Sequence, residues 1–358
     1  MIAPPTAAPI AGSFGPDVSL LLHIGFHKTG TSWLQAHAFG SKAVGFASAG
    51  SEERIKRWIV APHDLDFDPE ACRTAFAERI EQIESRGLAP VLSAERLCGD
   101  MPFGSYDSAQ LAERLAASWP GSRVLIVIRE QRAVILSSYR QYVKVGGQAR
   151  LEEVLRPPDS KHPHAAPYLL LHFEYDRLIR RYDALFGEAS VLVLPFELFR
   201  REPQDFVRRL VEFAGATPQP GAIEALPFGH VVNTAWPPAA LFAKRWANFL
   251  LRGRINPWSP VDAKRGAGRR LNHALLGVGR SLPARAHEWI DHRMQATIAE
   301  AVADRYRESN ARTVALTGLD LAALGYEVAA AAAATATVSR ARRGPAEPAS
   351  ARVPRGRP

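Results

Sequence analysis

Short apolar runs alternate with longer helical stretches along this chain. Four runs are almost continuous in apolar side chains, as expected for strands buried on both faces of a parallel sheet; they are residues 18–24, 89–93, 123–128 and 190–194. Helices are predicted between and after them, over residues 69–85, 108–119, 166–186, 203–214, 236–251 and 294–326. This alternation predicts an α/β fold in which helices cover both faces of a central parallel sheet.

We expect one domain over residues 18–328, because no internal repeat and no proline-rich linker divides that span. Residues 1–17 are rich in proline and alanine, and residues 329–358 are rich in alanine and arginine, so both ends are predicted to be disordered. No stretch approaches the roughly 20 apolar residues of a membrane span. The start has no basic segment followed by an apolar core, so a cytoplasmic protein is predicted.

The formal net charge of +9 is unevenly spread. After residue 339, six arginines stand against one glutamate, and a solubilising extension without a nucleic-acid partner is the expected role of this tail. A second basic cluster, between Arg252 and Arg270, falls inside the predicted domain. The only two cysteines, Cys72 and Cys98, are expected to be reduced and buried.

The clearest chemistry lies where the first predicted strand ends. Gly25 and Gly30 bracket a turn, and the residues from Thr31 to Trp33 open a helix whose first backbone N–H groups lack partners within the helix. These donors and the positive end of the helix dipole favour an anion, and Lys28 adds a cation. In nucleoside-triphosphate loops a lysine directly follows the second glycine, but here Thr31 takes that place. Lys28 is therefore expected to contact a different bridging atom.

A second grip for an anion is predicted after the third strand. Arg129 ends that strand, and Ser137 follows two turns into the next predicted helix. Because ligands of open α/β folds bind beyond the carboxyl ends of the strands, both side chains can converge on one phosphate there.

The loop sequence from Lys28 to Trp33, KTGTSW, resembles the 5′-phosphosulfate loop of sulfotransferases that use 3′-phosphoadenosine 5′-phosphosulfate (PAPS), in their bacterial branch. The resemblance implies that Lys28 contacts the phosphosulfate bridge and that Trp33 stacks on adenine. It also implies that the 5′-phosphate is held by the loop residues Thr29, Gly30, Thr31 and Ser32.

Arg129, Ser137 and Tyr139 match the 3′-phosphate element of the same family in register, with Gln131 where that element has proline. Proline there mainly presets the first helical turn, so the departure is expected to cost little. Arg265 and Gly266 loosely resemble the late loop that closes over the 3′-phosphate. A solvated loop, or a grip on an anionic acceptor, is an equal alternative for this segment. In all, the resemblance covers about residues 18–328, with the family's terminal signature near residue 326.

The reaction implied is in-line transfer of a sulfuryl group to an acceptor hydroxyl, which depends mainly on positioning and charge stabilisation. The transferred group carries less charge than a phosphoryl group, so no metal is expected, and no acidic cluster suggests one. Glu95, at the end of the second predicted strand, is the candidate base, in the place where the family's cytosolic members carry histidine. Glu52, Glu53 and His63 are the alternatives.

Two other classes remain open from the sequence. In a P-loop kinase, Ser32 would hold magnesium and Glu95 or Glu197 would serve as the acid. In a non-catalytic binder of anionic glycans, the basic cluster between Arg252 and Arg270 would bind the ligand. The acceptor of a sulfotransferase, a carbohydrate or glycolipid, is implied only by the bacterial resemblance, because acceptor pockets are built by variable loops.

Overall fold

The structure is a computed structural model that describes residues 20–101, 104–156, 170–230 and 236–330. The predicted disordered lead, residues 1–17, lies outside these ranges, as does the predicted tail from residue 331 onward. The start of the helix predicted at residue 166 lies outside them too.

A five-stranded, fully parallel sheet forms the centre of the described part of the chain, with strand order β2-β3-β1-β4-β5. Its strands are β1 (Leu21–Gly25), β2 (Phe46–Ser48), β3 (Ala89–Ser93), β4 (Arg123–Ile128) and β5 (Val191–Pro195). The four predicted strands and the parallel α/β class are confirmed. Strand β2 was not predicted, since three residues are too few to show a period.

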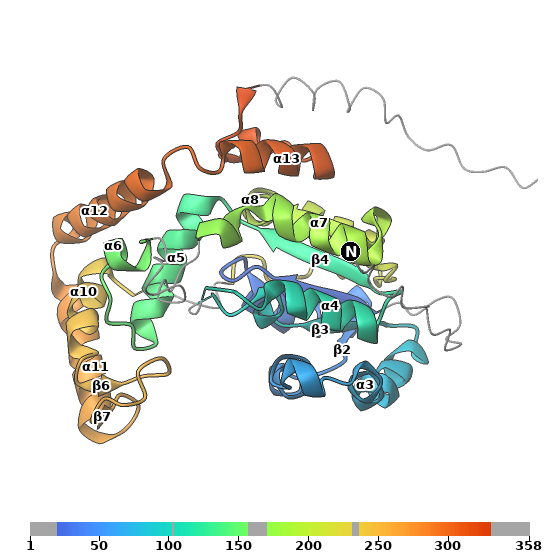
Figure 1. Ribbon diagram of the computed structural model, residues 1–358, viewed down its shortest axis with the longest axis horizontal. Coiled ribbons are helices and arrows are strands. Elements are labelled where there is room, and N and C mark those ends of the chain that lie inside the picture. The colour runs from blue at the N-terminus through green and yellow to red at the C-terminus, as the bar shows by residue number, and fades with distance from the viewer. Residues whose placement is uncertain (1–19, 102–103, 157–169, 231–235, 331–358) are drawn as a thin grey trace, which may run out of the picture.

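Helices cover both faces of the sheet, which explains the continuous apolar runs (Figure 1). Leu22 and Ile24 of β1 point into one core cluster, and Leu21 points into the other. The first cluster lies under α3 (Pro69–Glu84), α4 (Ser108–Ser118), α5 (Gln131–Lys144) and α7 (Tyr175–Phe186). The second lies under α9 (Pro203–Ala214) and the helix that follows β1. That helix is α1 (Thr31–Trp33) continued by a π-helical stretch, Leu34–Ala38.

The chain crosses from one side of β1 to the other after β3, so β1 lies between β3 and β4. Such a topological switch leaves a crevice beyond the carboxyl ends of the strands. The loops after β1, β3 and β4 all open into this crevice.

Residues 238–302 form an extension that we call the arm, which reaches away from the sheet on the side of α5 (Figure 1). It comprises α10 (Pro238–Ala247), β6 (Leu251–Arg252), β7 (Val261–Asp262), α11 (Gly266–Ser281) and α12 (Ala284–Val302). Helices α10 and α12 pack on α5, and α11 packs on α10. Helix α10 is shorter than the helix predicted over 236–251, and α11, which contains four glycines, was not predicted.

The closing segment is two helices rather than the single predicted one. Ala303, with a left-handed φ of 43°, separates α12 from α13 (Arg307–Thr317), which packs on α7. Short elements complete the described chain: α2 (Glu52–Ile55), α6 (Leu151–Val154) and α8 (Phe196–Arg201). None of the described helices is long and apolar enough to cross a membrane.

Candidate active site

The loop after β1 has backbone angles that favour glycine at position 30. Gly30 caps the following helix with φ 86°, and a Cβ built there would approach the ring of Phe196 to 2.9 Å. Lys28 also has a left-handed φ, 65°. A side chain at position 30 would be strained twice, by the backbone angle and by this contact.

The two threonines of the loop have different roles. The Thr29 hydroxyl donates a 2.5 Å hydrogen bond to the backbone oxygen of Phe26, so it holds the loop and does not face the cavity. The Thr31 hydroxyl is buried and has no hydrogen-bond partner among the described residues, yet Thr31 lines the cavity. A buried polar group is normally paired, so Thr31 is suited to a ligand atom.

Arg129 joins the end of β4 to the end of β1. Its Nη1 donates a 2.9 Å hydrogen bond to the backbone oxygen of Lys28, and its guanidinium lies 5.1 Å from the centre of the Phe196 ring. The Tyr175 hydroxyl in turn donates to the backbone oxygen of Arg129 at 2.5 Å. The two predicted anion grips therefore meet in one place.

A cavity of about 760 Å³ opens at this junction, bordered by Lys28, Gly30–Trp33, Glu95, Arg129 and Ser137. Among the described residues, eight lysine and arginine side chains line it against three carboxylates. The basic ones are Lys28, Lys56, Arg96, Arg129, Arg140, Lys144, Arg200 and Arg254, and the acidic ones are Glu52, Glu95 and Asp100. This excess of positive charge favours an anionic ligand.

Lys28 and Glu95 form the electrostatic centre of the cavity. Burial lowers the pKa of Lys28, and the nearby Glu95 carboxylate partly restores it. Burial likewise raises the pKa of Glu95, against the effect of the Lys28 charge and of a hydrogen bond from the Lys28 backbone amide. Each group therefore helps keep the other charged in a site that would otherwise neutralise both.

Two comparisons with known proteins found a match. The sequence model of the sulfotransferase family matches residues 36–220, a span that includes β2 to β5 and therefore Glu95, Arg129 and Ser137. The chain belongs to the sulfotransferase family. Among solved structures, a sulfotransferase from Alicyclobacillus acidocaldarius is similar at 20% identity with a TM-score of 0.41, over 68% of this chain and 98% of that one. No curated protein matches the chain in sequence.

Two of the residues expected to bind the donor of this sulfotransferase lie away from the cavity. Arg265 and Gly266 are exposed at the start of α11 and do not border it. The same basic segment instead contributes Arg254, ahead of β7. Arg254 borders the cavity and Arg265 does not, because Arg265 lies at the start of α11, a helix that was not predicted, and is exposed there.

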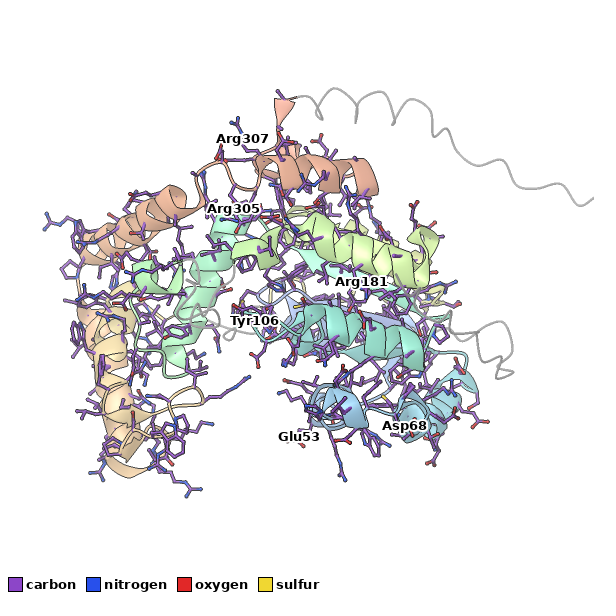
Figure 2. The ribbon with its side chains drawn as sticks, in the orientation of Figure 1. Glu53, Asp68, Tyr106, Arg181, Arg305 and Arg307 are labelled. Atoms are coloured by element: carbon purple, nitrogen blue, oxygen red, sulfur yellow. The ribbon has the colours of Figure 1, made fainter. Side chains whose placement is uncertain are left out.

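The alternative bases are separated by the structure as well. Glu52 borders the cavity but is paired with Lys56 at 2.5 Å. Glu53 points outward from α2 at the edge of the molecule (Figure 2). His63 accepts a hydrogen bond from the backbone of Leu65 and does not border the cavity.

The sequence analysis missed several cavity residues of this sulfotransferase. Arg140 and Lys144 follow Ser137 at three and seven positions along α5, so helical spacing alone could have placed them on the same face. Arg200 lies in α8, the short helix that directly follows β5. No sequence pattern could have predicted that Arg254 borders the cavity, because its position depends on how the arm packs against the rest of the chain.

His27, which flanks the loop after β1, was not among the predicted site residues. It borders the cavity, and its Nδ1 lies 3.4 Å from the Cys98 sulfur. Burial, with the positive charges around it, lowers the pKa of His27 to about 3, so the ring is neutral near pH 7. Among the described residues, no group of three or more His, Cys, Asp or Glu side chains has the arrangement of a metal site.

Proposed function

We propose that this sulfotransferase takes a sulfuryl group from PAPS and transfers it in line to a hydroxyl of a carbohydrate or glycolipid. The observation that carries the proposal is the hydrogen bond from Arg129 to the backbone of Lys28, which unites two independent anion grips. A nucleotide with phosphate at both ends of its ribose needs two such grips at a short separation.

The chain's own residues fit that donor. The Gly30–Trp33 turn, with the unpartnered Thr31 hydroxyl, would hold the 5′ end, and Arg129 with Ser137 would hold the 3′-phosphate. Arg254 takes the part first expected of Arg265. For adenine we propose an aromatic group rather than Trp33 alone: Trp33 is 5% exposed and stacks on Phe228 at 5.3 Å, and Phe199 packs beside it. Phe199 and Phe228 border the cavity with it.

When bound, PAPS supplies a sulfuryl group attached to a phosphate that can leave. With PAPS bound, the Lys28 ammonium would stabilise the negative charge that grows on the departing oxygen. Glu95 accepts the proton of the attacking hydroxyl, since burial raises its pKa toward the range useful for a base. Both roles depend on the loops after β1 and β3, which bring Lys28 and Glu95 to the same cavity.

The proposal is tested by titrating the protein with 3′,5′-adenosine bisphosphate in a calorimeter. We expect binding without magnesium and no comparable binding of ATP. Arg129→Ala should weaken the bisphosphate by about tenfold or more, since a charge-assisted hydrogen bond contributes roughly 1.5–3 kcal/mol.

Arg132→Ala is the matched control, because Arg132 lies three residues further on and is paired with Glu327 outside the cavity. Unchanged affinity in Arg129→Ala would contradict the 3′-phosphate site. Tight ATP binding that requires magnesium would favour a kinase instead. If the bisphosphate binds as expected, the acceptor is identified by incubating the protein and the labelled donor with cell-envelope extracts and analysing the labelled products by mass spectrometry.

A further inference from the structure

The arm carries most of the large apolar side chains that the described part of the chain exposes. Nine of the thirteen lie between residues 242 and 289. They are Phe242, Trp246, Phe249, Leu250, Trp258, Leu271, Val278, Leu282 and Trp289. Single exposed apolar residues are ordinary, but such a concentration marks an interaction surface.

Five of these side chains lie on α10, its extension and the β6–β7 connection. Phe242, Trp246, Phe249 and Leu250 recur at helical spacing along α10 and its extension, and the Trp246 and Phe249 rings are 6.0 Å apart. Trp258 is 94% exposed at the tip of the β6–β7 connection. That connection is fastened to the end of α10, where the Ser259 hydroxyl donates to the backbone oxygen of Phe249.

Trp289 of α12 completes this aromatic surface. With Phe242 and Trp246 it lines a separate cavity of about 350 Å³ between α10, α12 and α5. The cavity is also lined by Arg245, whose guanidinium lies 4.6 Å from the Trp246 ring centre, and by Arg293, 5.6 Å from that of Trp289. Aromatic rings and arginines are thus interleaved on the arm.

The arm is strongly basic as well. Residues 238–302 contain eleven lysines and arginines against four aspartates and glutamates, which makes them +7 of the chain's +9. Several of the arginines are exposed; they include Arg252, Arg254, Arg265, Arg269, Arg270, Arg280 and Arg285.

The charge and the apolar side chains of the arm together distinguish between the partners that could bind it. A second copy of the chain packed on the same face would bring two +7 surfaces together, and like charges oppose such a contact. A nucleic acid would match the charge but not the aliphatic residues Leu250, Val278 and Leu282. An anionic bilayer matches both, because tryptophan and phenylalanine insert at the headgroup level while arginines pair with lipid phosphates.

We propose that the arm docks this protein on the surface of anionic membranes, without a membrane-spanning segment. The active-site cavity would then open close to the lipid headgroups, since Leu241, Arg254 and Ile255 of the arm border it. That placement would suit a lipid-borne acceptor, a consequence that rests on the proposed function, whereas the docking itself does not.

The experiment is flotation of the full chain with vesicles of phosphatidylcholine alone or with about one third phosphatidylglycerol. We expect binding to the anionic vesicles, little to the neutral ones, and release when salt is raised from about 0.05 M to about 0.5 M. Trp258→Glu should lower the partition coefficient at least about tenfold, because it removes an inserted ring and adds repulsion.

Two matched controls separate docking from general surface effects. Leu65→Glu makes the same kind of change at an 89% exposed residue outside the arm, and its vesicle binding should equal that of the unaltered protein. For charge, Arg270→Glu should lower binding at least about fivefold. Arg86→Glu, at an exposed arginine after α3, should have little effect. Circular dichroism checks that each variant folds.

Several outcomes would overturn the proposal. They are equal flotation with neutral and anionic vesicles, no flotation at all, and equal losses in Trp258→Glu and Leu65→Glu. Self-association that Trp258→Glu abolishes, without vesicle binding, would assign the surface to a second copy. Lys28→Ala should float normally, so failure of the proposed catalytic role would leave docking intact, and the reverse also holds.

Discussion

Lys28 and Glu95 lie beside each other at the ends of β1 and β3, and burial alone would drive both toward their neutral forms. Their mutual attraction opposes that shift, so the charged pair depends on each partner. A donor anion beside Lys28 would favour its charged form further. In the proposed mechanism, this pair would couple donor binding to proton transfer.

Lys28→Ala is expected to lower turnover by about two to three orders of magnitude, since it removes the cation at the leaving oxygen. Binding of 3′,5′-adenosine bisphosphate should change by less than about tenfold, because Arg129 and the Gly30–Trp33 turn remain. Labelled-donor transfer and calorimetry give the two numbers. Lys56→Ala, which removes a cavity lysine paired with Glu52, should keep most of the turnover. A near-normal rate in Lys28→Ala would remove Lys28 from the mechanism.

Glu95→Gln is expected to lower kcat/KM by about two to four orders of magnitude and to change its pH profile. The active form is the carboxylate, so the rate of the unaltered protein should rise with pH through the pKa of Glu95. Burial moves that rise above the usual carboxyl range. Without the carboxylate, this limb of the profile should disappear. In Glu52→Gln it should persist, and the opposite pattern would make Glu52 the base.

Helix α5 connects the cavity at the carboxyl ends of the strands to the C-terminal helices. Gln131 begins it, in the place where the resembling motif has proline, and its side chain is buried. Its Nε2 donates to Asn310 Oδ1 at 2.6 Å, and Asn310 Nδ2 donates back at 3.2 Å. Glutamine at this position therefore has a structural role that proline could not have, because its side chain ties α5 to α13.

Asn310→Ala should lower the free energy of unfolding by about 1–3 kcal/mol, because it leaves the buried Gln131 amide without its main partner. The double variant Gln131→Leu with Asn310→Leu should lose less than the sum of the two single variants. Urea denaturation measures these values. Gln82→Ala, which breaks an exposed amide contact with Glu78, should change stability by less than about 0.5 kcal/mol. Strict additivity in the double variant would contradict the coupling.

Burial keeps three histidines of the folded protein neutral near pH 7. Burial lowers the pKa of His23 to about 3, of His27 to about 3 and of His172 to about 4. Below about pH 6.5 these histidines are protonated in the unfolded chain but not in the folded chain. The free energy of unfolding is therefore highest above that pH and falls on acidification. Each histidine contributes a slope of about 1.4 kcal/mol per pH unit at most.

Unfolding by urea should therefore need less denaturant at pH 5 than at pH 7. His172→Phe should reduce this acid sensitivity, since the ring packs on Phe26 at 4.9 Å and its buried Nε2 has no partner among the described residues. Replacement of the exposed His273 by glutamine should leave the sensitivity unchanged. Equal pH dependence in His172→Phe and the unaltered protein would show that another group is responsible.

The sequence by itself determined the layers of this protein and the places of the two predicted anion grips. Short continuous apolar runs bounded by turn residues are typical of strands covered on both faces, and the lysine, glycine and hydroxyl residues from Lys28 to Ser32 occupy consecutive positions. Both are local properties, so Arg129, Ser137 and the helices over 69–84 and 203–214 could be placed from neighbouring residues alone.

Only the tertiary structure decided which distant segments meet. The Thr29 hydroxyl turns inward, and Glu53 and His63 lie outside the cavity. Arg254 rather than Arg265 reaches the cavity. The position of each residue relative to the cavity depends on contacts between segments that are far apart in sequence. The strand β2 and helix α11 likewise form because of what they pack against. Their own residues are too few or too rich in glycine to specify them, and packing supplies the free energy that local preference lacks.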